Sequence, residues 1–453
     1  MTLRLSYEDG TVRFDADEED DLPRLPDVES EERVSGASAR APAYRYAHLR
    51  TVLDEREIPY EDDVLVAEGL DLATTYDLRP YQRAALDAWR DAGERGVVEL
   101  PTGSGKTVIA VVAAAELGTA TLVVAPTVDL VTQWRQELTT EFDVPVGQLG
   151  GGEQTVEPVT VATYDSAYLR ADELGDRFGL VVFDEVHHLG GEGYRDAARL
   201  CAAPARLGLT ATFERPDGAH EVVADLVGDR IYRLDPDELA GEFLAEYDLR
   251  RVAVELTDAE RERYDERQEQ FVDYLRSSGI SMESGSDWQE LVKRSGSDPR
   301  AREAMLAKQE AREIMMNAER KVERLAEILD RHRDDRVIVF TAHTDLVYRL
   351  SERFLIPAIT AETGAAERRR VLERFRDGRY SRVVAANVLD EGVDVPDANV
   401  GVVLSGSGSE REFTQRLGRI LRPKAGESGA GRATLYEVVT AETAEERVAA
   451  RRR

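Results

Sequence analysis

The stretch GVVELPTGSGKTVIAVVAAAEL, residues 96–117, joins an apolar strand to an apolar helix through a glycine-containing turn. Glycines let backbone N–H groups turn inward around a phosphate, and the N-terminus of a helix favours negative charge. We therefore expect Lys106 to reach the β- and γ-phosphates of a nucleotide and the Thr107 hydroxyl to hold Mg²⁺. Leu100 stands where the strict motif has glycine, and an ordinary glycine turn is the alternative. The strand before the turn and the helix after it favour the phosphate site.

Apolar runs alternate with helical stretches around this turn. Over residues 66–235 the runs ATLVVAP, PVTVATY, GLVVFDE and ARLGLTAT are separated by stretches such as TVDLVTQWRQELTTEF. This alternation predicts a doubly wound parallel sheet. The same pattern recurs over residues 320–453, in RVIVFTAH, SRVVAANV and NVGVVLSG, and predicts a second α/β lobe.

Two further segments differ from these lobes. Residues 1–65 begin with the alternating LRLSYEDGTVRF, pass through an acidic linker and end in a short helical stretch, which predicts a small α+β domain. Residues 236–319 lack strand runs and contain long charged helices, of which the one from Asp298 is expected to continue into the second lobe. The predicted fold is thus α/β, with two doubly wound parallel-sheet lobes, a helical insert and a small N-terminal α+β domain.

The charge of the chain is strongly acidic. Acidic residues outnumber basic ones by 89 to 59, which gives a net charge of −30, and only 5 of the basic residues are lysines. One interpretation is a protein that avoids polyanions. We favour a halophilic organism, in which an acidic surface stays hydrated and its repulsion is screened by concentrated salt. Net charge therefore does not exclude nucleic acid, and we expect an activity optimum at high KCl.

The compartment is predicted from three weaker signals. No apolar run is long enough to span a bilayer, so no membrane is expected as a partner. The first residues lack the pattern of a secretory signal. The single cysteine, Cys201, cannot form an internal disulfide. We expect a cytoplasmic protein.

Two carboxylates follow a buried strand in LVVFDEVHHLGG, residues 180–191. Side chains at the carboxyl ends of parallel strands face the ligand in open α/β sheets. We expect Asp184 to hold Mg²⁺, usually through its water shell, and Glu185 to orient and deprotonate the attacking water, which is a Walker B pattern. His187 is expected to couple the phosphate to the second lobe, with an ordinary loop histidine as the alternative. We assign His188 a structural role.

Arginines recur at helical spacing in EFTQRLGRILRP, residues 412–423. Arg416, Arg419 and Arg422 would share one helix face, which either is solvated or faces a phosphate. Gln415 among them favours the phosphate. An arginine aimed at a γ-phosphate contributes on the order of 10³–10⁵ in rate, and we expect Arg419 and Arg422 to act in this way. Since these arginines belong to the second lobe, hydrolysis would require the lobes to close.

The motifs occur in a diagnostic order. LRPYQ, LPTGSGKT, APTVDLVTQW, FDEVHH, LGLTATFER, VIVFT, VLDEGVDVPDANV and QRLGRILRP resemble the motif set of superfamily 2 helicases, in particular XPB-type DNA helicases of archaea. The resemblance covers nearly the whole chain and implies RecA-like lobes. It further implies ATP-driven 3′→5′ DNA unwinding or translocation in nucleotide excision repair and, in eukaryotic relatives, in promoter opening. The implied cofactors are ATP and Mg²⁺, the implied partner is single-stranded, forked or damaged DNA, and a repair nuclease is a further candidate partner.

The resemblance also assigns roles to residues by their position in these motifs. The nucleotide would be bound by Arg79, Gln82, Pro101, Thr102, Gly103, Ser104, Gly105, Lys106, Thr107, Gly392 and Asp394, with Arg79 and Gln82 reading adenine. Catalysis would involve Lys106, Glu185, Gln415, Arg419 and Arg422, and the metal would be held by Thr107 and Asp184. Hydrolysis would be coupled to movement by His187, Thr210, Ala211, Thr212 and Arg416. DNA would be contacted by Pro126, Thr127, Gln133, Arg215, Asp217 and Thr341.

The smaller segments gain roles by the same resemblance. Residues 1–65 would be a damage-recognition domain, with a plain docking module as an equal alternative. Residues 236–319 would be a thumb that grips DNA, with a solvated helical pair as the alternative. The family usually carries Arg-Glu-Asp after Thr-Ala-Thr as a strand-separating element, but here Pro216 stands in the middle. Because proline removes a carboxylate and an N–H and stiffens the loop, we expect strand separation to be weaker than translocation.

Three other functions are alternatives to this one. A double-stranded DNA translocase that remodels without unwinding is the first alternative. A DEAD-box RNA helicase is disfavoured by the D-E-V-H box and the T-A-T motif. A non-catalytic DNA-binding scaffold is disfavoured because the phosphate lysine, both carboxylates and both candidate arginine fingers are intact.

Overall fold

The computed structural model describes residues 3–16, 29–31, 37–67, 69–191, 193–214, 218–235, 238, 247–281, 285–386, 398–405 and 433–450. The chain divides into two compact units, residues 1–239 with 391–393 and residues 240–390 with 394–453. The described residues contain a five-stranded and an eight-stranded sheet in the first unit and a six-stranded sheet in the second.

The N-terminal sheet is built on the hairpin that the sequence predicts. Strands β1 (Leu3–Glu8) and β2 (Thr11–Ala16) pair antiparallel, and Asp9 and Gly10 form the turn with φ of 49° and 77°. Asp-Gly is a favoured pair for such a turn because both residues tolerate positive φ. The order is β3-β4-β2-β1-β5, with β3 (Glu29–Glu31), β4 (Ala37–Pro42) and β5 (Tyr60–Asp63). The 3₁₀ turn η2 (Ala43–Arg45) leads into helix α1 (Tyr46–Glu55), which packs its buried side chains against this sheet.

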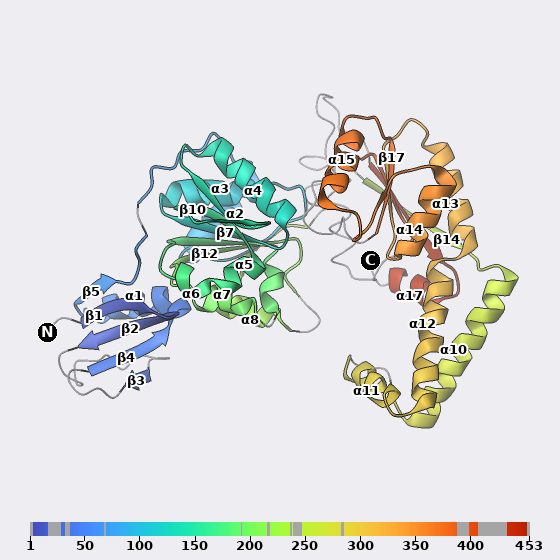
Figure 1. Ribbon diagram of the computed structural model, residues 1–453, viewed down its shortest axis with the longest axis horizontal. Helices are drawn as coiled ribbons and strands as arrows, with labels where there is room; N and C mark the ends of the chain where they lie inside the picture. Colours follow the sequence, from blue (N-terminus) through green and yellow to red (C-terminus); the bar gives the residue numbers. More distant parts are fainter. Residues whose placement is uncertain are drawn as a thin grey trace. The chain divides into compact units, whose positions relative to one another are not determined.

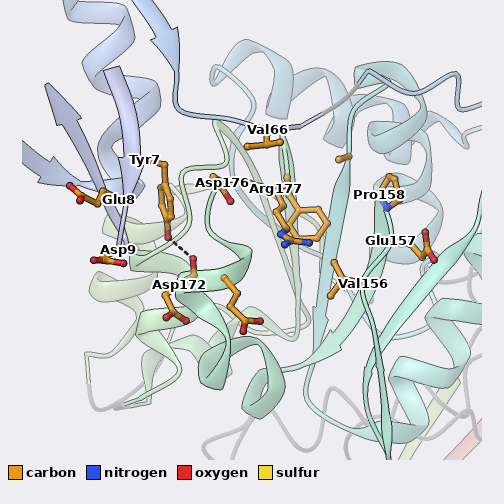
Figure 2. Close-up of a pocket in the computed structure, with 13 residues that line it drawn as sticks. Tyr7, Glu8, Asp9, Val66, Val156, Glu157, Pro158, Asp172, Asp176 and Arg177 are labelled. Atoms are coloured by element: carbon orange, nitrogen blue, oxygen red, sulfur yellow. Dashed lines mark hydrogen bonds between the residues drawn. The ribbon is translucent and has the colours of Figure 1, made fainter. Parts of the chain in front are cut away.

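Tyr7 fastens this small sheet to the rest of the first unit. Its hydroxyl shares its one hydrogen between the carbonyl oxygens of Leu200 at 2.8 Å and Asp172 at 3.2 Å, and Figure 2 draws the contact with Asp172. A side chain at Gly175 would place Cβ 1.9 Å from the Tyr7 hydroxyl, so this contact requires glycine. A groove of about 810 Å³ lies beside the contact, and carboxylates predominate among its charged lining groups (Figure 2).

The eight-stranded sheet carries the first lobe. Its order is β13-β6-β12-β11-β7-β10-β8-β9, and every pairing is parallel except that of β8 with β9. The strands are β6 (Arg95–Glu99), β7 (Thr121–Ala125), β8 (Val146–Gly150), β9 (Glu153–Thr155), β10 (Val159–Thr163), β11 (Leu180–Asp184), β12 (Ala205–Thr210) and β13 (Arg230–Arg233). The central strands β12, β11, β7 and β10 are buried along their whole length, because helices cover both of their faces.

Helices lie on both sides of this sheet, with α3 and α4 above and α5 to α8 below in Figure 1. The helices of the first lobe are α2 (Pro80–Asp91), α3 (Lys106–Leu117), α4 (Val128–Glu141), α5 (Tyr164–Leu169), α6 (Ala171–Leu174), η3 (Val186–Gly190), α7 (Arg195–Arg199) and α8 (His220–Leu226). This is the doubly wound arrangement that the alternating pattern predicts.

The second unit is built on a parallel sheet of order β14-β19-β18-β15-β17-β16. Its strands are β14 (Tyr247–Val254), β15 (Val337–Phe340), β16 (Ala358–Ile359), β17 (Arg382–Ala385), β18 (Val400–Val403) and β19 (Ala433–Thr440). Its helices are α10 (Asp258–Ser278), α11 (Gly285–Ser295), α12 (Pro299–Met316), α13 (Glu319–Arg331), α14 (Thr344–Phe354), α15 (Ala365–Arg376) and α17 (Ala444–Ala450). Helices α10 and α12 lie side by side and project from the sheet in Figure 1.

Two details of residues 236–333 differ from the sequence-based expectation. The expected absence of strands is wrong, because β14 is an edge strand of the six-stranded sheet. The sequence shows no apolar run at β14 because the strand contains charged residues. One of them is paired, since Arg251 Nε lies 2.9 Å from the Glu437 carboxylate. The expectation of one continuous helix from Asp298 into the second lobe is also wrong, since the chain turns at Ala318 (φ −47°, ψ 135°) between α12 and α13. The N–H of Glu319 is satisfied there by Glu260 Oε1 at 2.9 Å.

The α/β class with two doubly wound parallel-sheet lobes and a small N-terminal domain is therefore confirmed. Across the described ranges no helix is long and apolar enough to cross a membrane.

Candidate nucleotide-hydrolysis site

The phosphate turn lies between β6 and α3. Gly103 and Gly105 have φ of 83° and 79°, which side chains rarely adopt, so glycine is needed at both positions. Lys106 begins α3, and its Nζ donates to the carbonyl oxygens of Leu100 at 2.9 Å and Pro101 at 3.4 Å. The ammonium group is thus held over the turn itself, within reach of a phosphate bound there. The apolar side chain of Leu100, which stands where the strict motif has glycine, is fully buried.

Two side chains of α2 hold the turn from behind. The amide nitrogen of Gln82 donates to the carbonyl oxygens of Ser104 at 2.9 Å and Gly105 at 3.3 Å, and its Oε1 accepts from the N–H of Arg79 at 2.9 Å. The hydroxyl of Tyr81 donates to the same Ser104 carbonyl at 2.6 Å. The expected adenine reader, Gln82, is therefore bonded at both ends to the protein and shapes the phosphate turn.

Asp184 ends β11 with its carboxylate fixed by two donors. Oδ2 accepts from the indole N–H of Trp134 at 2.8 Å, and Oδ1 accepts from the N–H of Glu185 at 3.0 Å. Burial, followed by the Glu185 carboxylate, raises the pKa of Asp184 to about 6, while the Trp134 bond and the Lys106 ammonium act in the opposite direction. A cation bound here would offset the cost of keeping this carboxylate ionised.

Glu185 is held in an uncommon conformation at the end of the strand. Its φ is 48°, in the left-handed region, and its side chain is 12% exposed. The atom Oε2 is buried without a hydrogen-bond partner, and Nδ1 of His187 lies 3.5 Å from it. An unsatisfied buried carboxylate oxygen is costly, and it fits a group that accepts a hydrogen bond or a proton from a bound water molecule.

The donor set fits Mg²⁺, which prefers oxygen ligands and usually keeps several waters. The Asp184 carboxylate retains lone pairs beyond its two hydrogen bonds, and the Thr107 hydroxyl lies in the first turn of α3. Within the described part of the chain no group of three or more His, Cys, Asp or Glu residues could hold a metal by itself. The residues therefore fit an ion that takes most of its ligands from phosphate and water.

A hydrogen-bonded chain runs from Glu185 to the Thr-Ala-Thr motif. Nδ1 of His187 lies 3.1 Å from Oγ1 of Thr210, whose hydroxyl donates to the Thr212 carbonyl at 2.8 Å. Because that hydroxyl has only one hydrogen, Nδ1 must be the donor to Thr210. The structure thus brings His187, Thr210 and Thr212 together with Glu185, and the neighbouring Ala211 is 5% exposed.

The candidate DNA contacts are more scattered. Thr127 caps α4 by accepting from the N–H of Leu130 at 3.3 Å, Pro126 beside it is half-buried, and Gln133 is exposed on α4. Thr341 lies in the second unit, is fully buried, and shares a hydrogen bond of 2.8 Å with Ser405. Its hydroxyl therefore does not face solvent. The candidate residues Arg215, Asp217, Gly392, Asp394, Gln415, Arg416, Arg419 and Arg422 lie outside the described residues.

Sequence reasoning missed Trp134 and Tyr81. Trp134 lies 50 residues from the carboxylate that it orients, and tryptophan in an apolar helix face is ordinarily a core residue. A signal was present in both cases, because indole and phenol groups that are buried usually find a polar partner.

A glycine turn with a lysine held over it, a carboxylate pair at the end of a parallel strand and a Thr-Ala-Thr motif hydrogen-bonded to His187 are typical of a P-loop ATPase of the two-lobed helicase class. Three family models match parts of the chain. The Xeroderma pigmentosum group B helicase damage recognition domain matches residues 5–64, the type III restriction enzyme res subunit matches 75–215, and the ERCC3/RAD25/XPB C-terminal helicase matches 302–453.

Curated relatives give the family. The chain is 45% identical to the DNA 3′-5′ translocase XPB2 of Sulfurisphaera tokodaii, over 91% of this chain and 92% of the relative. It is 35% identical to the putative DNA 3′-5′ helicase Rad25 of Halobacterium salinarum, over 89% of this chain and 61% of the relative. It is 31% identical to the DNA 3′-5′ helicase XPB of Mycobacterium tuberculosis, over 83% of this chain and 63% of the relative. The chain belongs to the XPB family of helicases.

A solved structure agrees on the fold. The helicase domain of Pyrococcus furiosus Hef covers 83% of this chain and 98% of its own length, with a TM-score of 0.52 and 21% identity. At this identity the likeness supports the RecA-like helicase lobes alone.

Proposed function

We propose that the chain is an ATP-driven motor that moves 3′→5′ on DNA and separates strands less strongly than it translocates. One observation supports ATP hydrolysis in particular. The Oε2 atom of Glu185, next to the Asp184 carboxylate and near the phosphate turn, is buried without a hydrogen-bond partner. That the motor acts on DNA is inferred from the names of the relatives, which are DNA 3′-5′ helicases and translocases.

The chain's own groups divide the work as follows. Lys106, released from the carbonyl oxygens of Leu100 and Pro101, would neutralise phosphate oxygens. Glu185 would orient the attacking water and take its proton at Oε2. Bound Mg²⁺ would neutralise part of the negative charge that develops on the phosphates.

Protonation of Glu185 would also change the hydrogen bonds of His187 and Thr210. Once Oε2 is neutral, it no longer attracts the N–H of His187 at 3.5 Å. The bond from His187 to Thr210 is then free to adjust, and the change reaches the Thr-Ala-Thr motif. This gives hydrolysis a direct physical route to a segment that the family uses for movement.

A double-stranded DNA translocase without unwinding is the second candidate. It is favoured by Pro216, which removes a carboxylate from the family's strand-separating element. The relative from Sulfurisphaera tokodaii is likewise named a translocase.

ATPase stimulation tests the proposal. The activity of the parent and of Lys106→Ala would be compared with single-stranded, forked, damaged and fully duplex DNA, and with RNA. We expect DNA to stimulate the parent and Lys106→Ala to be inactive. Absence of stimulation by every DNA, or stronger stimulation by RNA, would overturn the proposal. Displacement of a third strand from a triplex, measured beside unwinding of a fork, distinguishes translocation from unwinding, and Pro216→Glu should increase only the unwinding.

Several finer points belong to the same proposal. The metal is Mg²⁺, the process is nucleotide excision repair with a nuclease as partner, and the compartment is the cytoplasm. Residues 1–65, 66–235, 236–319 and 320–453 act as damage-recognition domain, ATP-binding lobe, DNA-gripping insert and second lobe. A net charge of −30 supports a cytoplasm rich in salt. Full folding and turnover in dilute buffer would contradict that last point.

A further inference from the structure

A second connection leaves the phosphate turn at Glu99, the last residue of β6. Its side chain is 9% exposed, in a position where an unpaired carboxylate would be costly. Arg230 on the neighbouring strand β13 supplies the partner, with Nη1 2.9 Å from Oε2 of Glu99. The pair lies directly before the turn that holds Lys106.

The backbone next to Glu99 is a junction of the site. The N–H of Leu100 donates to the Thr210 carbonyl at 3.0 Å, and the Leu100 carbonyl accepts from the Lys106 ammonium at 2.9 Å. Any change in Lys106 when phosphate binds therefore acts on residues 99–100. Glu99 therefore lies next to a backbone segment whose hydrogen bonds depend on whether a nucleotide is bound.

Arg230 has a second partner on the far side. The same Nη1 lies 3.3 Å from Oε1 of Glu214, and the guanidinium carbon is 5.9 Å from the ring centre of Phe213. Phe213 and Glu214 directly follow Thr212 and directly precede the Arg-Pro-Asp segment. One guanidinium group thus joins the start of the phosphate turn to the segment after the Thr-Ala-Thr motif.

The position of Arg230 is built into the strand. Pairing of β13 with β6 shifts register between Arg230 and Tyr232, which makes Ile231 the extra residue of a bulge. Gly96 gives room for it, since a Cβ there would lie 2.6 Å from Ile231. Bulges of this kind re-aim side chains next to active sites, and here Arg230 faces Glu99.

We propose that Arg230 is a positioning residue that couples the nucleotide state to DNA movement, by a route separate from His187. The inference rests on the proposed motor function. It differs from a merely structural role, which would lower hydrolysis and movement in proportion. Loss of coupling instead lowers the amount of movement obtained for each ATP hydrolysed.

Three variants separate these outcomes. Glu214→Gln removes the charge of the outer partner only, whose side chain is 71% exposed, so the fold should be kept. Arg230→Lys keeps a charge for Glu99 but lacks the planar fork of donors. Arg230→Met removes both contacts. Arg170→Met is the matched control, because Arg170 and its partner Glu173 are 29% and 58% exposed, against 28% and 71% for Arg230 and Glu214.

Triplex displacement and ATPase rate would be measured on the same samples, with thermal unfolding alongside. We expect Glu214→Gln and Arg230→Lys to keep kcat within about twofold but to lose displacement per ATP by a factor of about three to ten. Arg170→Met should match the parent. If displacement per ATP is unchanged in every Arg230 and Glu214 variant, or if both rates fall together, Arg230 has no coupling role. A parent that shows no DNA-stimulated ATPase would instead overturn the motor function itself.

Discussion

The side chain of Gln82 donates to the carbonyl oxygen of Ser104 at 2.9 Å, and so a residue of helix α2 sets the conformation of the phosphate turn. The resemblance to helicases assigns this glutamine to the adenine base. In the structure its oxygen and its nitrogen are both bonded to the protein, to Arg79 and to the turn. If Gln82 shapes the turn, its loss should affect ATP and GTP alike. If Gln82 reads the base, its loss should affect ATP alone.

Gln82→Ala is expected to lower kcat/KM for ATP about tenfold, since hydrogen bonds of about 1 kcal/mol each are lost from the turn. Because phosphates are common to all nucleotides, kcat/KM for GTP should fall by a similar factor. The measurement is the ATP to GTP ratio in parent and variant, with the exposed Gln136→Ala as a control. A fall for ATP alone would favour the adenine role.

His187 and Thr210 are predicted to act as one unit. Thr210→Val and His187→Ala each break the 3.1 Å contact between them. We expect ATPase activity to fall less than DNA displacement in both, and the double variant to lose little more than either single one. His48→Ala, an exposed histidine of helix α1, should leave both rates unchanged. Additive losses in the double variant would contradict a shared path.

Much of this site could be predicted from the sequence because its motifs are local. The turn at residues 101–107 and the carboxylates after β11 are placed by the strands that precede them, and apolar runs reveal those strands. Trp134 and Arg230 could not be found in this way, since each meets its partner only through the order of strands in the sheet. The edge strand β14 was missed because ion pairs let charged residues stand where an apolar run is expected.

The loss of folding stability at acidic pH should depend partly on His343. Burial, followed by the positive charge of Arg312, lowers the pKa of this imidazole from its usual value of 6.5, while Glu313 and Asp345 act in the opposite direction. Between the folded and unfolded pKa values the unfolded chain binds more protons, so this contribution to stability is complete above pH 6.5 and is lost as the pH falls below it.

His343→Gln removes that titration. Urea unfolding at pH 7.5 and at pH 5.5 is the measurement, and the variant should lose less stability between the two pH values than the parent does. Equal losses would show that the pKa of His343 is the same in both states.

Lys321 forms a buried ion pair that ties the start of the second lobe to its end. Its ammonium is fully buried and donates to both carboxylate oxygens of Glu445, at 2.8 and 2.7 Å, and to the Leu404 carbonyl at 2.6 Å. All three of its donors are therefore used. Lys321→Met would leave the carboxylate of Glu445 without its counter-ion, at a cost of about 3–5 kcal/mol in the free energy of unfolding.

The double variant Lys321→Met with Glu445→Leu distinguishes a pair kept for stability from one kept for geometry. Two apolar side chains of similar volume are expected to restore part of the stability lost by the single variant, because the desolvation of both charges is avoided, while the Thr440 N–H loses its acceptor, Glu445 Oε2 at 2.8 Å. Denaturant unfolding of the parent, of both single variants, Lys321→Met and Glu445→Leu, and of the double variant gives the coupling free energy. The Leu404 carbonyl has lost its donor in the double variant as well, so a stable but slower ATPase would assign the pair to positioning the end of strand β18. A double variant as unstable as Lys321→Met would show that the ion pair itself holds this lobe together.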